Sequence, residues 1–113
     1  MEEQVSSDQV NGLPAAAGIA EGTARVVLST EMFDQVEHGE IMVCQMTNPA
    51  WVVVFSKVKG VVTDTGGVLC HTAVVAREFG IPGVVGTGDA TQRIKTGDRV
   101  RVNGSTGVVE ILK

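Results

Sequence analysis

The sequence has no tyrosine, and aromatic residues of any kind make up only 4% of its 113 residues. This scarcity argues against binding single-stranded nucleic acid, because that mode depends on stacking bases against aromatic side chains. Basic residues are also in the minority: nine Lys and Arg stand against 13 Asp and Glu, for a net charge of −4. Nucleic-acid-binding domains usually carry the opposite balance. We therefore expect no nucleic-acid partner.

Cysteines and long apolar runs are scarce as well. The two cysteines, Cys44 and Cys70, do not make a disulfide framework. The longest apolar run, Ala50 to Phe55, is far too short to span a bilayer. The first residues, Met1 to Gln4, are acidic and lack the apolar core of a signal peptide. These absences predict a cytoplasmic protein without a membrane partner.

Valine and glycine dominate what is present, with 21 and 14 copies, and apolar residues reach 43%. Valine favours strands and glycine favours tight turns. Strand patterns are expected over 23–29, 40–45, 60–64, 84–85, 98–103 and 107–112. A β-helix-β stretch over 60–85 then predicts an α/β domain. We assign 1–11 to a flexible N-terminal segment, 12–113 to the domain, and 12–18 to a turn.

Short helices are expected between these strands. The first covers 30–36 with Thr30 as its cap, and the second runs from Pro49 to about Lys57 behind an Asn48 cap. A third covers about 71–79 and ends at Gly80, and a helical turn through Ile94 follows Asp89 as its cap. We interpret Arg77 and Glu78 as anchors of the third helix.

The segment over 63–73 holds the strongest candidate for chemistry. A buried strand ends there, the Gly66-Gly67 pair frees the backbone, and His71 stands at a helix N-terminus. The positive end of the helix dipole disfavours the imidazolium, and the neutral imidazole is the nucleophilic form. The free N–H groups of the first helical turn suit a phosphoryl group carried by that ring. Thr65 and Thr72 could add hydroxyl donors.

Purely structural interpretations of the same residues stay open at this point. A histidine beside an apolar helix is more often structural or a cap, and His38 is expected to be solvated in its acidic stretch. Neither histidine has metal-ligand spacing to Cys44 or Cys70, so we expect no metal. Cys70 and His71 point about 100° apart on a helix, which disfavours a catalytic dyad and makes Cys70 a packing residue. No lysine-terminated phosphate loop exists, so the chain is expected to bind no nucleotide cofactor itself.

The run over 66–86 closely resembles the phosphohistidine domain, also called the swivelling or mobile domain, of PEP-utilising enzymes. The family pattern is a glycine pair, a small residue, and then His-x-Ala-x-x-Ala-Arg-x-x-Gly-Ile-Pro, and every part is matched. Segments 39–43, 47–51, 89–91, 96–98, 100–104 and 107–109 also fit, so the resemblance covers roughly 12–112. The Thr-Asn-Pro-Ala-Trp segment over 47–51 is most similar to the phosphoenolpyruvate synthase and rifampicin phosphotransferase branch.

The resemblance implies a compact β/β/α fold and a carrier function. In this family an ATP-grasp domain transfers the β-phosphoryl group of ATP to the histidine, which delivers it to pyruvate or another acceptor. Phenylphosphate synthase-like systems, with a phenol as acceptor, divide this machinery among subunits. By position His71 is the carrier, with Thr65, Gly66, Gly67, Cys70 and Thr72 around the phosphoryl group. Nε2 is the expected site of attachment, because Nδ1 lies nearer the backbone and can be held by a local hydrogen bond.

The chain also departs from the family pattern. It has Ala-Ala-Gly over 16–18 where Ser-Pro-Gly is common, Leu69 where Thr is common, and Asn103 where Asp is common. The ATP-grasp and acceptor-binding domains are absent, so Mg-ATP is expected only at a partner and the chain is not expected to be active alone. A separate subunit and an excised domain both fit. The alternative function is a non-catalytic interaction or regulatory module that retains the fold.

Overall fold

Eight strands follow one another in the order β1-β8-β7-β3-β4-β5-β6-β2 in the computed structural model, which describes residues 8–112. The strands are β1 (Gln9–Asn11), β2 (Leu13–Ala16), β3 (Ile19–Val26), β4 (Ile41–Cys44), β5 (Gly60–Thr63), β6 (Gly83–Val85), β7 (Arg99–Asn103) and β8 (Val108–Leu112). The helical segments are the 3-10 helices η2 (Thr30–Gln35) and η3 (Pro49–Trp51) and the α-helices α1 (Val52–Phe55), α2 (His71–Phe79) and α3 (Ala90–Arg93).

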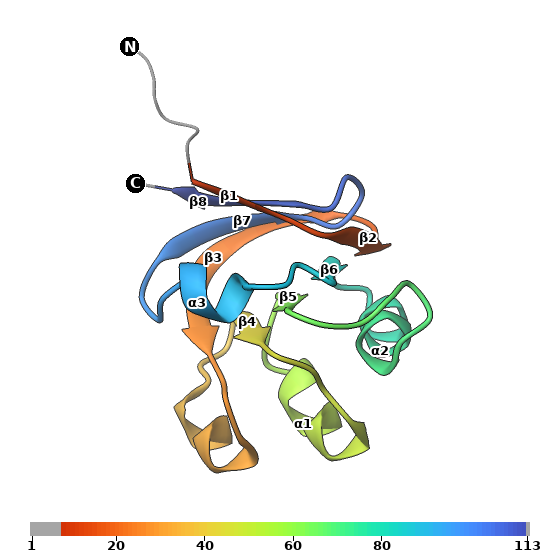
Figure 1. The fold of residues 1–113 in the computed structure, drawn as a ribbon. Coiled ribbons are helices and arrows are strands. Elements are labelled where there is room, and N and C mark those ends of the chain that lie inside the picture. The colour runs from red at the N-terminus through yellow and green to blue at the C-terminus, as the bar shows by residue number, and fades with distance from the viewer. Residues whose placement is uncertain (1–7, 113) are drawn as a thin grey trace.

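Strand β3 belongs to both layers of the sheet. Its first half, 19–23, pairs antiparallel with β7, and its last residues, 24–26, pair parallel with β4. Strands β4, β5 and β6 continue the parallel layer, whereas β7, β8 and β1 continue the antiparallel one. The two layers face each other, and α1 and α2 lie on the other side of the parallel layer (Figure 1). The compact β/β/α fold expected from the sequence is confirmed.

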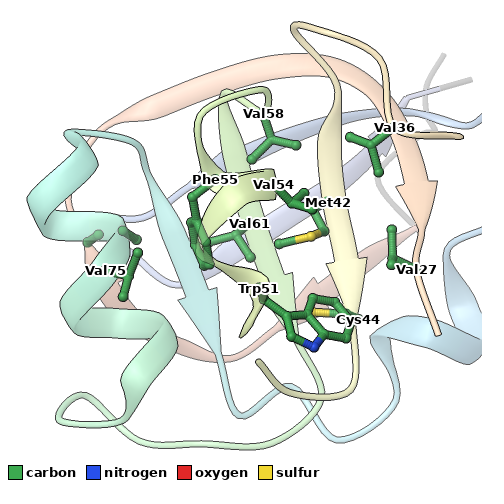
Figure 2. Packing of buried hydrophobic residues seen from close by; sticks show 12 residues of the cluster. Val27, Val36, Met42, Cys44, Trp51, Val54, Phe55, Val58, Val61 and Val75 are labelled. Atoms are coloured by element: carbon green, nitrogen blue, oxygen red, sulfur yellow. The ribbon is translucent and has the colours of Figure 1, made fainter. Parts of the chain in front are cut away.

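The alternation of side chains along β4 builds two cores from one strand. Ile41 and Val43 belong to the cluster between the sheet layers, which is rich in valine from β5, β6, β7 and β8. Met42 and Cys44 belong to the cluster on the helical side, together with Trp51 and residues of α1 and α2 (Figure 2). All four residues of β4 are fully buried. Such burial on both faces explains why this central strand contains only apolar residues.

The N-terminal boundary expected from the sequence is wrong by several residues. Gln9–Asn11 form β1, which pairs antiparallel with β8, and Val10 is fully buried. Residues 1–7 lie outside the part that the structure describes. The stretch expected to be a turn over 12–18 contains β2, which pairs with β6 at the other edge of the sheet. Both strands are short and gain their order from pairing with distant parts of the chain, which local patterns do not report.

Strand positions in the remainder follow the sequence more closely. The strands expected over 40–45, 60–64, 84–85, 98–103 and 107–112 are confirmed within two residues at their ends. The strand expected over 23–29 begins earlier, at Ile19, and ends at Val26. The earlier start reflects pairing with β7, because the segment around Gly22 lies on the antiparallel layer.

Two helix boundaries are confirmed by their caps. The side chain of Asn48 accepts a hydrogen bond from the Ala50 N–H at 2.9 Å, with Pro49 in the first turn. Helix α2 covers 71–79 and ends at Gly80, whose φ of 72° lies in the left-handed region that favours glycine. The position of His71 at the start of α2 therefore follows directly from the sequence.

Of two other expected caps, one lies at a different residue and the other is at the expected residue but lacks the side-chain bond. Ser29, not Thr30, is the N-cap of η2, and its side chain makes no capping hydrogen bond. Asp89 is the N-cap of α3 but its side chain also makes no capping bond. Asp64 replaces it, because its carboxylate accepts hydrogen bonds from the N–H and hydroxyl of Thr91, at 2.9 and 2.6 Å. A cap supplied from 27 residues away leaves no local signal.

Candidate functional site

The candidate site lies at the carboxyl edge of the parallel strands, where α/β sheets commonly bind ligands. Strand β5 ends at Thr63, and the segment over 64–70, here called the glycine loop, leads to the first residue of α2. Thr65 fixes the start of this loop, since its N–H and its hydroxyl both donate to the Gln45 carbonyl at 3.0 Å. The first residues of the loop are therefore bonded to the residue that follows β4, and the loop ends at His71.

The two glycines of the loop have different structural roles. Gly66 has φ of 109°, and a Cβ there would lie 2.8 Å from the Cys70 Sγ, so a side chain is strained at this position. A Cβ on Gly67 would meet nothing within 4 Å, and the φ of Gly67 is not in the left-handed region, so space lies open beside it. Gly66 is needed for the turn, while Gly67 leaves the backbone accessible from outside.

His71 begins α2 directly after the N-cap residue Cys70, whose side chain makes no capping hydrogen bond. The Cys70 carbonyl accepts the Val74 N–H at 3.1 Å, which leaves the first-turn N–H groups ahead of Val74 outside the helical ladder. Such groups, with the positive end of the helix dipole, favour an anion beside the imidazole.

A buried threonine holds the histidine ring. The Thr47 Oγ1 lies 2.9 Å from the His71 Nδ1 and 2.6 Å from the Thr72 Oγ1. Thr47 and Thr72 are only 5% and 3% exposed. When the His71 Nδ1–H donates to Thr47, the Thr47 hydroxyl is free to donate to Thr72, and the lone pair of the ring is then on Nε2. The opposite direction of donation places the ring proton on Nε2.

Sequence reasoning missed Thr47. Thr47 stands immediately before Asn48 and Pro49, where the next helix begins. The packing of β4 and this helix brings it into contact with His71, which lies 24 positions later in the chain. Nothing in the local pattern marks this contact. The available signal was its place in the segment over 47–51, which carries part of the family resemblance.

The structure brings some of the sequence-predicted residues together, whereas the side chains of others contact different parts of the domain. His71 and Thr72 meet at Thr47, and Gly66 and Gly67 lie in the loop before them. The Thr65 hydroxyl donates to Gln45 instead of projecting toward the ring. Cys70 packs against a small buried cluster of Ala15, Ala73 and Val85.

Other titratable groups lie apart from this site. His38 is exposed in the turn before β4. Burial raises the pKa of the Cys44 thiol to about 12, with a further contribution from the Asp64 charge. Across residues 8–112, no three His, Cys, Asp or Glu side chains gather in a way that could hold a metal ion. Over the same residues, no helix is long and apolar enough to cross a membrane.

Comparison with known proteins places this geometry in a family. The sequence model described as PEP-utilising enzyme, mobile domain, matches residues 36–107. A rifampicin phosphotransferase of Bacillus cereus is 44% identical over 110 residues, which are 97% of this chain and 13% of that protein. A phosphoenolpyruvate synthase of Aeropyrum pernix is 48% identical over 101 residues, which are 88% of this chain and 12% of that protein.

A solved structure agrees with the sequence relatives. The NMR solution structure of an Enzyme I protein (nEIt) is similar with a TM-score of 0.61 and 34% identity, over 70% of this chain and 33% of that one. The chain spans 12–13% of the length of the curated relatives described above. The match of the family model over most of the chain and the shared fold lead to one conclusion: the chain belongs to the mobile-domain family of PEP-utilising enzymes.

Proposed function

We propose that this chain is a phosphoryl carrier that accepts a phosphoryl group on Nε2 of His71 and delivers it to an acceptor held by another domain or subunit. The observation that carries the proposal is the contact between the Thr47 hydroxyl and the His71 Nδ1 at 2.9 Å. This contact occupies one ring nitrogen and fixes the ring plane at the N-terminus of α2. The other nitrogen, Nε2, is then the one available to attack phosphorus.

The chemistry balances with a nucleoside triphosphate as donor. The Nε2 lone pair forms a P–N bond to the β-phosphorus of ATP, and the bonds from that phosphorus to both neighbouring phosphates are broken. One neighbour leaves as AMP, and water takes the other as inorganic phosphate. The Nδ1 proton stays on the ring and is shared with Thr47, so the phosphorylated imidazole is cationic at the ring. In the second step an acceptor oxygen attacks phosphorus, and the P–N electron pair returns to Nε2.

The surroundings of the ring support its role as an acceptor of phosphoryl groups. The first-turn N–H groups of α2 and the open backbone at Gly67 suit three anionic oxygens. In this proposal Thr72 acts through Thr47, because their hydroxyl oxygens lie 2.6 Å apart in a buried position. Cys70 and Gly66 shape the loop, and Thr65 ties the loop to the end of β4.

The partners are proposed from two features. Apolar side chains are exposed beside the site, with Leu69 at 84% and Met46 at 62%, which suits docking of a protein surface over the ring. The two ends of the described chain leave side by side, because the Ile111 N–H donates to the Asp8 carbonyl at 2.8 Å, and they lie away from α2 (Figure 1). We assign an ATP-grasp domain carrying Mg-ATP and an acceptor-binding domain as the partners. A cytoplasmic location stays a prediction.

The experiment measures the intact mass of the chain after two phosphorylation reactions. The first uses potassium phosphoramidate, which transfers its phosphoryl group to imidazole with release of ammonia. The second uses Mg-ATP with a purified ATP-grasp domain of a phosphoenolpyruvate synthase, with radioactive phosphorus in either the β or the γ position. In the Mg-ATP reaction we expect one acid-labile adduct of one phosphoryl group, with label only from the β position. Phosphoramidate is expected to label His71 and, as a chemical reagent, also the exposed His38.

His71→Ala and His38→Ala are the matched variants for this experiment. The His71 variant is expected to keep its fold by circular dichroism and to lose the adduct of the Mg-ATP reaction, whereas the His38 variant keeps both. An adduct that persists in His71→Ala in the Mg-ATP reaction would overturn the assignment of the carrier. Absence of any adduct with an active ATP-grasp domain would favour the non-catalytic interaction or regulatory module instead.

A further inference from the structure

The Arg77 side chain joins three segments at the site. Its Nε donates to the Ala15 carbonyl of β2 at 2.7 Å, and its Nη2 donates to the Val68 carbonyl of the glycine loop, also at 2.7 Å. Val68 lies three residues before His71 in the loop that leads to the ring. A single guanidinium on α2 therefore connects the helix, an edge strand and the loop.

An irregularity in β2 makes one of these acceptors available. In the pairing of β2 with β6, Pro14 lies opposite Val84 and Ala16 lies opposite Gly83, so the register shifts at the residue between them. The extra residue of such a bulge is left out of the ladder. Ala15 is 3% exposed, and a buried carbonyl needs a hydrogen-bond partner. Arg77 supplies that partner.

The glycine loop has little else to hold its middle. Val68 is 42% exposed and Leu69 is 84% exposed, so the side chains at the tip of the loop contribute little packing. Within the loop, the Cys70 N–H donates to the Gly67 carbonyl at 3.0 Å. The bond from Arg77 to Val68 ties this turn to the last part of α2.

Among the described residues, the charge of Arg77 has no ion-pair partner. Within residues 8–112, no carboxylate lies within ion-pair distance of its guanidinium. The planar fork of an arginine can serve two carbonyls in fixed directions at once, which a single ammonium group on a flexible stem cannot do. The side chain is therefore suited to setting a geometry.

We infer that Arg77 is a positioning residue for phosphoryl transfer, which holds the glycine loop against β2 so that the loop backbone and His71 keep one arrangement around the phosphoryl group. The inference rests on the proposed function of His71. It goes beyond anchoring of the helix, because it assigns to Arg77 an effect on the rate of phosphorylation at a residue that it does not touch.

The first test compares the two histidines of one molecule. Potassium phosphoramidate phosphorylates the chain, and the rates at His71 and at the exposed His38 are followed separately by peptide mass analysis. In Arg77→Gln we expect the rate at His71 to fall about tenfold relative to the rate at His38, because small misplacements of reacting groups are costly. Arg77→Lys is expected to lie between, since it retains one donor. Arg101→Gln, which removes an exposed guanidinium on β7, is expected to behave as the unaltered chain.

The second test measures the loop itself by amide hydrogen exchange, at a temperature where circular dichroism finds all variants folded. The Cys70 amide is expected to exchange faster in Arg77→Gln, while amides of β7 keep their rates. An unchanged ratio of rates at His71 and His38 in this variant would overturn the inference and leave the carrier function standing. A failure of His71 to react in the unaltered chain would instead count against the proposed function, and unchanged exchange at Cys70 would count against the role of Arg77 in the loop.

Discussion

The hydroxyl of Thr47 lies 2.9 Å from the Nδ1 of His71, although the two residues are 24 positions apart in the chain. The contact joins the segment that follows β4 to the start of α2, and Thr47 is buried. A buried hydroxyl with two partners has a fixed position. The orientation of the imidazole is therefore set by the core of the domain as well as by the helix that carries it.

Thr47→Val tests this relationship, because valine keeps the shape of threonine and removes the hydroxyl. We expect phosphorylation of His71 to slow by about 10- to 100-fold, as befits loss of a hydrogen bond to a group that becomes charged. The Thr72 hydroxyl also loses its partner, so the variant is expected to be about 1 kcal/mol less stable. The rate follows from phosphoramidate labelling and the stability from urea denaturation.

Thr47→Ser is the control for this prediction, since it retains the hydroxyl and loses only a methyl group. It should recover most of the rate. Equal rates in the Val and Ser variants would mean that the hydroxyl does not position the ring.

The two loop glycines should respond differently to alanine. A Cβ on Gly67 meets nothing within 4 Å, so Gly67→Ala is expected to fold with unchanged stability and to lower the rate of transfer by hindering approach of the phosphoryl group to the backbone. A Cβ on Gly66 would meet the Cys70 Sγ at 2.8 Å with φ at 109°, so Gly66→Ala is expected to cost about 1–3 kcal/mol of stability. Urea denaturation and phosphoramidate labelling of both variants separate the two effects.

A bulkier Gly67→Val should lower the rate further than Gly67→Ala. Unchanged transfer in the valine variant would show that the open backbone at this position is not used.

The sequence was sufficient for the central part of the fold and for the position of His71. Helix α2 and its end at Gly80 follow from local signals, because the Gly66-Gly67 pair and Gly80 bracket a helical pattern. Strands β1 and β2 were not predictable, since Gln9–Asn11 and Leu13–Ala16 are ordered by partners far along the chain. The role of Thr47 was not predicted for the same reason. Contacts that depend on tertiary packing leave no periodic pattern in the residues that make them.

Acid should weaken the domain through Glu40. Its carboxylate accepts hydrogen bonds from Arg25 at 3.0 and 2.9 Å and from the Glu37 N–H at 2.8 Å. Burial alone raises the pKa of Glu40, but these bonds outweigh it, and the net pKa lies below the ordinary value of 4.5. A carboxyl whose pKa is lower in the folded state stabilises the fold above its unfolded pKa, and this contribution is lost as the pH falls through the folded value. The free energy of unfolding should therefore decrease from about pH 5 downward.

Glu40→Gln provides the measurement that assigns this effect. The variant should be about 2 kcal/mol less stable at pH 7, because a buried charged hydrogen bond is replaced by a neutral one. The difference between the variant and the unaltered chain should shrink as the pH approaches about 3. Glu21→Gln is the control, since Glu21 is also paired with arginines but lies on the exposed surface. A difference that stays constant with pH would contradict the assignment to Glu40.

The two cysteines should differ sharply in reactivity toward a thiol reagent. Cys44 is fully buried in β4, where burial and then the Asp64 charge raise its thiol pKa to about 12, so almost no thiolate forms at neutral pH. Cys70 is only half-buried at the start of α2. We expect Ellman's reagent to titrate one thiol in the folded chain and the second only as the chain unfolds. In Cys70→Ser the fast reaction should vanish, and in Cys44→Ser it should remain. Two thiols reacting at equal rates in the folded chain would contradict the buried position of Cys44, and with it the packing of β4, the strand that leads to Thr47 and its contact with His71.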